Sequence, residues 1–145
     1  MKGRGGRTVE VCPPRTFTFS KLGDGLEQTV LVMERIDCSG YETCDLIVRV
    51  HTDATISDSA ASISIEVVPD GFTMDDPAQS FFADELDTPV TFTGASPPTA
   101  GNVQVRTYTS GLGAMLAVRV KGEQSNPAGA ALTARISIEL ALREC

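Results

Sequence analysis

The sequence has no tryptophan, one histidine and two tyrosines. Sugar-binding clefts usually present aromatic rings for stacking, so this composition disfavours a carbohydrate-binding surface and the cleft that a glycosidase needs. The single histidine, His51, has no nucleophile-elbow sequence beside it, and a glycine-rich phosphate loop is also missing. We therefore expect a protein that is not an enzyme, needs no cofactor and does not act on a small molecule.

Long apolar runs are missing as well. No stretch approaches the roughly 18 consecutive apolar residues of a transmembrane helix, so we expect no membrane partner. The first seven residues are basic and glycine-rich, and no apolar run follows them as it would in a signal peptide. This predicts a protein made in the cytoplasm without a signal peptide, unless a leader was removed.

Basic side chains are absent from the middle of the chain. Residues 50–105 hold nine acids and no lysine or arginine, in a chain of net charge −7. Phosphate groups require a basic face, so we expect no nucleic-acid partner. The acids form either a solubilising surface or a surface that binds a partner or a cation, and the sequence leaves both readings open.

The densest carboxylate cluster begins at Asp70 and includes Asp75 and Asp76. Calcium prefers several oxygen ligands from a flexible loop, which makes these three residues the calcium candidates. Their spacing does not match an EF-hand loop. We therefore expect an ordinary acidic loop and no metal site, and a calcium site is the alternative.

Four cysteines allow three disulfide pairings. Cys38 and Cys44 bracket a short connection and would close a small loop. Domain termini often lie close together, so a Cys12–Cys145 bond is conceivable. Free thiols are the usual state in the cytosol, and with a single histidine a structural zinc site is disfavoured. The sequence leaves thiols and disulfides as alternatives.

Alternation of apolar and polar residues predicts strands along the whole chain. The clearest case is 132–143, where every even position from Leu132 to Leu142 is apolar. Residues 62–67 alternate as well, and Pro69-Asp70-Gly71 after them predicts a turn. Residues 29–36 are more uniformly apolar, which predicts a central strand or one covered on both faces. Further strands are expected at 16–20, 44–51, 90–93, 103–106 and 116–120, and residues 78–86 fit either a short edge strand or a loop.

No segment has the periodicity of an amphipathic helix. Eight or nine short strands separated by glycine and proline turns predict an all-β fold, a two-sheet antiparallel β-sandwich with jelly-roll or Greek-key connections. We expect residues 9–145 to form this single domain. Residues 1–8 are expected to form a flexible basic arm that either docks on a neighbouring subunit or stays disordered, and its interaction residues would be Lys2, Arg4 and Arg7.

An acidic, tryptophan-free β-sandwich with a short basic arm and no leader resembles the small accessory proteins of bacterial virus particles, such as capsid decoration, head-fibre or tail components. The resemblance concerns the general character of the whole chain and rests on no motif. It implies a structural protein that binds a larger protein assembly as a homo-oligomer within a virus particle. The alternative is an extracellular module for carbohydrate or calcium-dependent binding, which oxidised cysteines would favour.

Overall fold

The computed structural model describes residues 6–19, 27–56, 59–71, 81–82, 88–109, 112, 114–124 and 132–144. These residues form nine strands. None of them belongs to a helix that is long and apolar enough to cross a membrane. The strands are β1 (Arg7–Phe19), β2 (Glu27–Asp37), β3 (Thr43–Thr55), β4 (Ser62–Gly71), β5 (Phe81–Phe82), β6 (Val90–Thr93), β7 (Val103–Tyr108), β8 (Met115–Glu123) and β9 (Leu132–Arg143).

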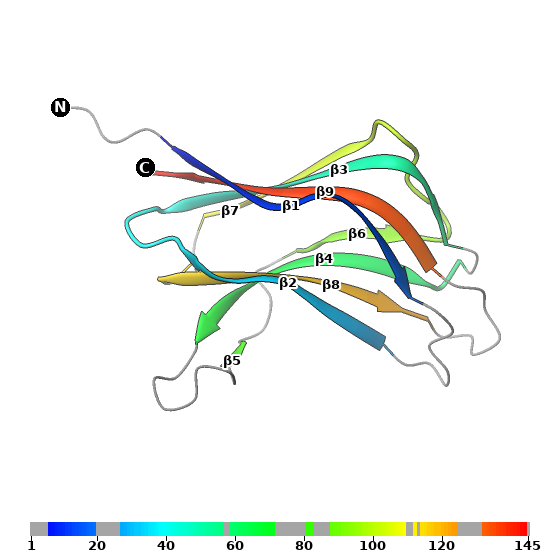
Figure 1. Cartoon of the computed structure of the whole chain (residues 1–145), viewed down its shortest axis with the longest axis horizontal. Coiled ribbons are helices and arrows are strands. Elements are labelled where there is room, and N and C mark those ends of the chain that lie inside the picture. Colours follow the sequence, from blue (N-terminus) through cyan, green and yellow to red (C-terminus); the bar gives the residue numbers. More distant parts are fainter. Residues whose placement is uncertain are drawn as a thin grey trace.

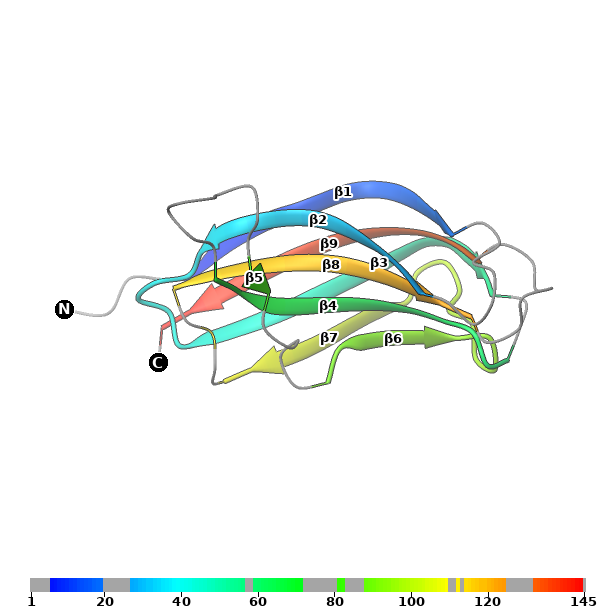
Figure 2. The same cartoon turned by 90° about the horizontal axis from the view of Figure 1, so that it is seen from below.

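The strands form two antiparallel sheets packed face to face (Figure 1). The upper sheet has the order β1-β9-β3-β7. The lower sheet has the order β2-β8-β4, and both β5 and β6 pair with β4. Strands β1 to β4 alternate between the sheets, as do β7, β8 and β9, which is a jelly-roll order. The predicted all-β sandwich is confirmed, and Figure 2 shows β1 and β2 along one side of it and β6 and β7 along the other.

The core lies between the two sheets and follows the alternation of the sequence. On β9, Ile136, Ile138 and Leu140 are fully buried, while Arg135 on the opposite face is exposed. Burying an isoleucine or leucine contributes about 1.5–3 kcal/mol relative to leaving it in water. The largest fully buried apolar side chains come from both sheets: Phe19, Leu46, Ile63, Ile65, Leu116, Leu132, Ile136, Ile138, Leu140 and Leu142.

The uniformly apolar segment 29–36 is not a central strand, so this prediction is wrong. It lies in β2, which is at the edge of the lower sheet and pairs only with β8. Leu31 is 43% exposed, and Ile36 is the one fully buried residue of the strand. Two register shifts and the left-handed φ of 56° at Arg35 interrupt the pairing with β8. Such irregularities add residues to one strand, so an apolar run here does not imply two covered faces.

The turn expected at Pro69-Asp70-Gly71 is also wrong, because these residues continue β4. Pro69 pairs with Leu116, and the following two residues pair with the short strand at 81–82. The fixed φ of proline is compatible with extended chain, so proline alone does not end a strand. The alternative of a short edge strand within residues 78–86 is the one that the structure contains.

The first strand begins earlier than the boundary at residue 9 suggested. Arg7 and Thr8 pair with Leu142 and Ala141 of β9, so they belong to the upper sheet. The Arg7 guanidinium donates a hydrogen bond to the backbone oxygen of Asp37 at 3.1 Å. Arg7 is therefore held against the body of the domain, whereas Lys2 and Arg4 lie outside the described residues.

Candidate functional site

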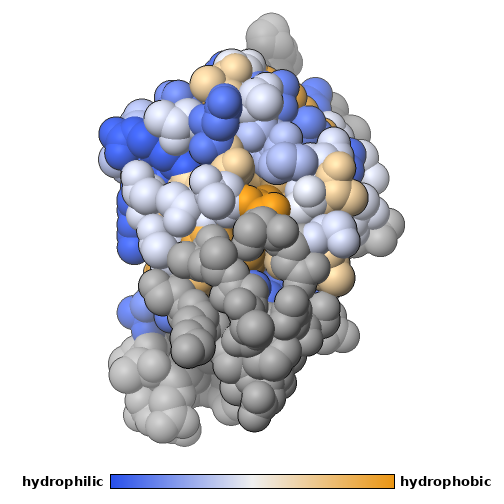
Figure 3. Space-filling view, turned by 90° about the vertical axis from the view of Figure 1, so that its right-hand side faces the viewer, coloured by the Kyte–Doolittle hydropathy of each residue, from blue (hydrophilic) through white to orange (hydrophobic). Residues whose placement is uncertain are grey.

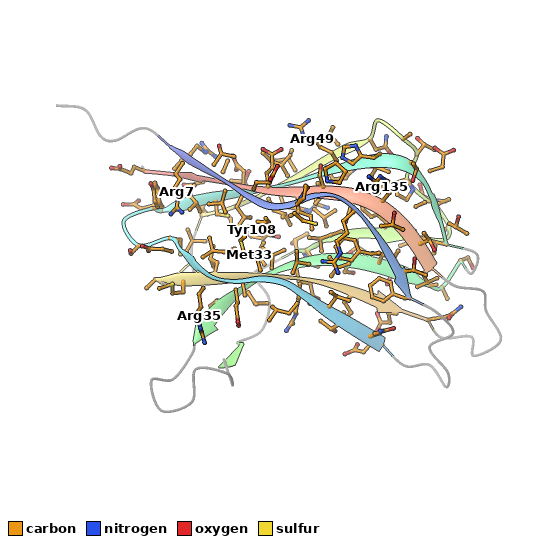
Figure 4. All side chains as sticks on the ribbon, in the orientation of Figure 1. Arg7, Met33, Arg35, Arg49, Tyr108 and Arg135 are labelled. Carbon is orange, nitrogen blue, oxygen red and sulfur yellow. The ribbon has the colours of Figure 1, made fainter. Side chains whose placement is uncertain are left out.

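The outer face of the upper sheet carries a network of paired charges across β3, β9 and β7. Arg49 on β3 faces outward (Figure 4) and its Nε lies 3.3 Å from Glu139 Oε1. Asp45 accepts bonds from the Arg143 guanidinium at 3.0 Å and from the Thr107 hydroxyl at 2.7 Å. Exposed ion pairs contribute only about 0–1 kcal/mol each. The network therefore orients the polar side chains more than it stabilises the fold.

An apolar strip lies beside this network and is formed by Ile47, Val103 and Val105. Ile47 is directly opposite Val105 in the pairing of β3 with β7, and Val103 is opposite Arg49. Val103 is 47% exposed and Val105 is 50% exposed, although both are β-branched residues that usually pack against a neighbour. The strip thus reaches the free edge of the sheet, with paired charges on its inner side.

The backbone of β7 is unpaired along its outer side. Val50 donates to the oxygen of Asn102 and accepts from the nitrogen of Gly101, both at 2.9 Å, so its backbone groups face β7. Backbone groups alternate sides along a strand, so the β7 residues that bond β3 are Gln104, Arg106 and Tyr108. It follows that Val103, Val105 and Thr107 direct their N–H and C=O groups away from β3. Among the described strands none pairs with that side.

The other sheet edges in the described part of the chain carry devices that discourage pairing with another chain. The β1 edge contains Pro13-Pro14, two register shifts and the charges of Glu10 and Arg15. The β2 edge has two register shifts and the left-handed Arg35. Strands β5 and β6 are only two and four residues long. Short strands, prolines, charges and bulges are the usual protections of edges, and β7 has a single charge, Arg106, and none of the others.

The end of the sandwich shown in Figure 3 is different from the β7 edge. Most of its described surface is hydrophilic, with small separate apolar spots.

Tyr108, the last residue of β7, lies between the sheets (Figure 4) and its hydroxyl donates to the backbone oxygen of Thr88 at 3.0 Å. This bond ties the end of β7 to the segment before β6 and fixes the edge strand on the body of the domain.

His51 contacts a serine that the sequence analysis did not single out. Its Nε2 lies 2.8 Å from Ser137 Oγ on the neighbouring strand β9. A serine nucleophile also needs backbone or side-chain donors aimed at a developing oxyanion. Strand β9 is paired with β1 on one side and β3 on the other, so backbone donors near Ser137 serve the sheet. The pair is a cross-strand hydrogen bond, and only knowledge of the strand pairing could have revealed it.

A buried ion-pair cluster lies on the lower sheet. The Glu66 side chain is 2% exposed, and its carboxylate is 2.6 Å from Arg119 Nε and 3.4 Å from Lys121 Nζ. Burial acts to lower the pKa of Lys121, but the nearby carboxylates of Glu66 and Glu27 outweigh it and raise that pKa above its ordinary value. Because a buried carboxylate requires partners, the cluster explains how Glu66 is accommodated within β4.

The three described cysteines, Cys12, Cys38 and Cys44, are buried free thiols in this structure. Burial is the main cause that raises the pKa of each, and for Cys44 it does so to about 12 with help from Asp45 and Cys38. Cys38 and Cys44 bracket the connection between β2 and β3. Cys145, the conceivable disulfide partner of Cys12, lies outside the described residues, so the choice between thiols and disulfides stays open.

The calcium candidates fall mainly outside the described residues. Asp75 and Asp76 are not described, and of Asp70 only the backbone, which belongs to β4, is described. Within the described ranges no group of three or more histidine, cysteine or acidic side chains is arranged to hold a metal ion. The expected acidic loop and its alternative, a calcium site at Asp70, Asp75 and Asp76, both stay untested.

No known family model matches the chain, and no curated protein matches it in sequence. Among solved structures, the VP2 subviral particle of infectious bursal disease virus matches with a TM-score of 0.49 and 11% identity over 96% of this chain and 32% of that one. The capsid of Ralstonia phage GP4 matches with a TM-score of 0.39 and 17% identity over 100% of this chain and 89% of that one.

The CBM22-1 xylan-binding domain of Paenibacillus barcinonensis Xyn10C matches with a TM-score of 0.34 and 8% identity, over 94% of this chain and 99% of that one. The chain spans at most 32% of the length of the first matched chains. All of these TM-scores are below 0.5, so the likenesses carry no argument about function.

Proposed function

We propose that this chain is a non-enzymatic structural protein that binds a larger protein assembly, as a decoration or accessory component of a virus-type particle. The observation that carries the proposal is the weakly protected edge of β7, with a single charge, and the apolar strip beside it. A free strand edge binds other chains through main-chain hydrogen bonds, and its exposed side chains supply selectivity.

The composition of this surface supports a protein partner. Two half-exposed valines next to Ile47 form a small apolar centre, and the Arg49–Glu139 and Arg143–Asp45 pairs form a polar border. Protein interfaces commonly combine an apolar centre with a polar rim. A sugar ligand would instead require exposed aromatic rings, and of the two tyrosines, both described, Tyr108 is buried and Tyr41 is partly buried against the core.

The assignment to a virus-type particle rests on the general character of the chain. The chain is acidic, with a net charge of −7, yet its first seven residues carry three basic side chains and no acidic one. This combination suits docking of one subunit's arm on the acidic surface of another, because opposite charges guide association. We include Lys2, Arg4 and Arg7 as interaction residues of the proposed assembly.

The test is native mass spectrometry of the protein purified from its natural source under non-reducing conditions. A large particle, or a defined complex that contains a second protein, is the expected result and would identify the partner by mass. A monomer with two disulfides or with bound calcium would replace this proposal with an extracellular binding module. Chains carrying Val105→Lys should be lost from the particle, whereas chains carrying Leu31→Lys, on the β2 edge, should be retained.

A further inference from the structure

We propose that β7 pairs with β7 of a second copy of this chain, in an antiparallel arrangement centred on Val105. The two upper sheets then join into one continuous sheet across a two-fold axis. The inference rests on the assembly role proposed above and deepens it by naming the occupant of the edge. It also explains why this edge, unlike the β1 and β2 edges, has no proline or register shift and only one charged residue to discourage pairing.

The backbone geometry of the edge suits this arrangement. In an antiparallel ladder, two opposite residues whose N–H and C=O groups face each other exchange both hydrogen bonds. The groups that β7 directs outward belong to Val103, Val105 and Thr107. Centring the two-fold axis on Val105 places Val105 opposite its own copy and Val103 opposite Thr107, so that every outward group meets a partner. If the register shifted by one residue, the outward N–H and C=O groups of one copy would face residues of the other copy whose N–H and C=O groups are already bonded to β3.

The side chains of β7 are compatible with self-pairing. Val103 and Val105 lie on the outer face with Ile47, so pairing joins the apolar strips of both copies into one patch. Cross-strand pairs of β-branched residues contribute roughly 0.2–1 kcal/mol each. On the other face, Arg106 lies opposite Gln104 of the copy, whose amide oxygen can accept from a guanidinium. The pairing therefore places no like charges directly opposite each other.

Charge also favours this edge for a contact between two copies. The chain carries a net charge of −7, so most contacts between copies bring carboxylates together. Strand β7 contains no acidic residue and one arginine. The nearest acid on the outer face, Asp45, is already held by Arg143 and Thr107. Two acidic molecules can thus approach along β7 with little repulsion. Isologous two-fold contacts of this kind are the commonest in homo-oligomers.

The first test is sedimentation of the purified full chain alone over a concentration series. We expect a monomer–dimer equilibrium for the unchanged protein. Val105→Lys should lower the association constant at least about tenfold, because two lysines would meet at the axis and like charges opposite each other destabilise a pair. Leu31→Lys is the matched control, since Leu31 is similarly exposed on a different edge, and it should leave the equilibrium unchanged.

The second test addresses the register. Directly opposite, hydrogen-bonded residues have Cα atoms about 5.5 Å apart, which suits a disulfide. The Val105→Cys variant should therefore form a covalent dimer when oxidised glutathione accepts the two electrons and two protons of the paired thiols. The Val103→Cys variant should not, because its opposite residue is Thr107. Unchanged protein run in parallel controls for the native cysteines.

Several outcomes would overturn the inference. They are a monomer at every concentration, an undiminished dimer in Val105→Lys, and equal cross-linking of the Val103→Cys and Val105→Cys variants. These results are separable from failure of the assembly role. A monomeric recombinant chain that still occurs in a complex in its natural source would remove self-pairing alone, whereas a recombinant dimer without a larger assembly would remove the assembly role alone.

Discussion

The ring of Phe19 in the upper sheet occupies the space that a side chain at Gly122 in the lower sheet would need. A Cβ atom built on Gly122 would lie 2.7 and 2.8 Å from the Cδ2 and Cδ1 atoms of the Phe19 ring, closer than carbon atoms approach without a shift. Phe19 is fully buried. The absence of a side chain at Gly122 thus allows β1 and β8 to pack closely across the core.

We predict that Gly122→Ala destabilises the domain by about 1–3 kcal/mol, because the added methyl group overpacks a filled core. At a strand position without this contact, replacing glycine by alanine would instead stabilise the domain, because glycine is otherwise unfavourable in a strand. Urea unfolding measures the change. Adding Phe19→Leu should make the effect of Gly122→Ala smaller than it is in the unchanged background. Equal effects in both backgrounds would show that Phe19 is not the residue that excludes a side chain.

A second prediction concerns Glu66. Replacing it by glutamine removes the buried carboxylate that pairs with Arg119 and Lys121, although Lys121 keeps Glu27 3.8 Å away, and should lower the free energy of unfolding by about 1–3 kcal/mol at neutral pH. Glu139→Gln removes an exposed ion pair with Arg49 and should cost less than about 1 kcal/mol. Similar costs for the two variants would show that burial of Glu66 adds nothing to its interactions.

The pKa shift of Lys121 gives the same cluster a pH dependence. Its folded pKa is raised above the ordinary 10.5, so its stabilising contribution is complete below that pH and is lost as the pH rises through the raised value. The difference in stability between the unchanged protein and Glu66→Gln should therefore narrow between pH about 8 and pH about 11.5, while part of it persists through Arg119. Urea unfolding at the two pH values measures this, and a difference that widens would contradict it.

The buried thiols lead to a fourth prediction. With a pKa of about 12, the Cys44 thiol is ionised in roughly one molecule in ten thousand at pH 8, and the thiolate is the form that reacts. We expect Cys12, Cys38 and Cys44 to resist iodoacetamide in the folded protein and to react fully in urea without a reductant. Mass spectrometry of peptides identifies each site. A pair of cysteines that reacts in urea only after reduction would be a disulfide. For Cys38 and Cys44, that result would support the disulfide alternative of the sequence analysis.

The sequence predicted the strands best where alternation was unbroken. Residues 132–143 coincide with β9, and residues 90–93 coincide with β6. The pattern was misleading in β2, because register shifts around Met33 separate hydrophobicity from burial. It was misleading again at Pro69, where pairing with Leu116 outweighs the local turn preference. Tertiary pairing decided both cases, and a single sequence does not contain that information in a local window.

The candidate edge could be predicted only in part. The sequence identified a strand at 103–106 but gave no reason to place it at the edge of a sheet. Val103 and Val105 look like core residues by alternation, and only the structure shows that they are half exposed on an edge strand. The sequence analysis missed this candidate surface because an edge is a property of the sheet order, which the hydrophobic pattern does not encode.

A last prediction concerns the basic residues before β1. Deleting residues 1–5 removes Lys2 and Arg4 but keeps Arg7, whose pairing with Leu142 belongs to the sheet. We expect the deletion to weaken binding to the larger assembly and to leave the melting temperature almost unchanged, because the described core contains none of the deleted residues. A chain with Lys2→Glu and Arg4→Glu separates charge from length and should bind at least as weakly. Added salt should reduce the difference in binding to the assembly between these variants and the unchanged protein, because screening weakens exposed charge contacts. Undiminished binding of both variants would mean that the arm is not part of the interface and that the sheet edge acts without it.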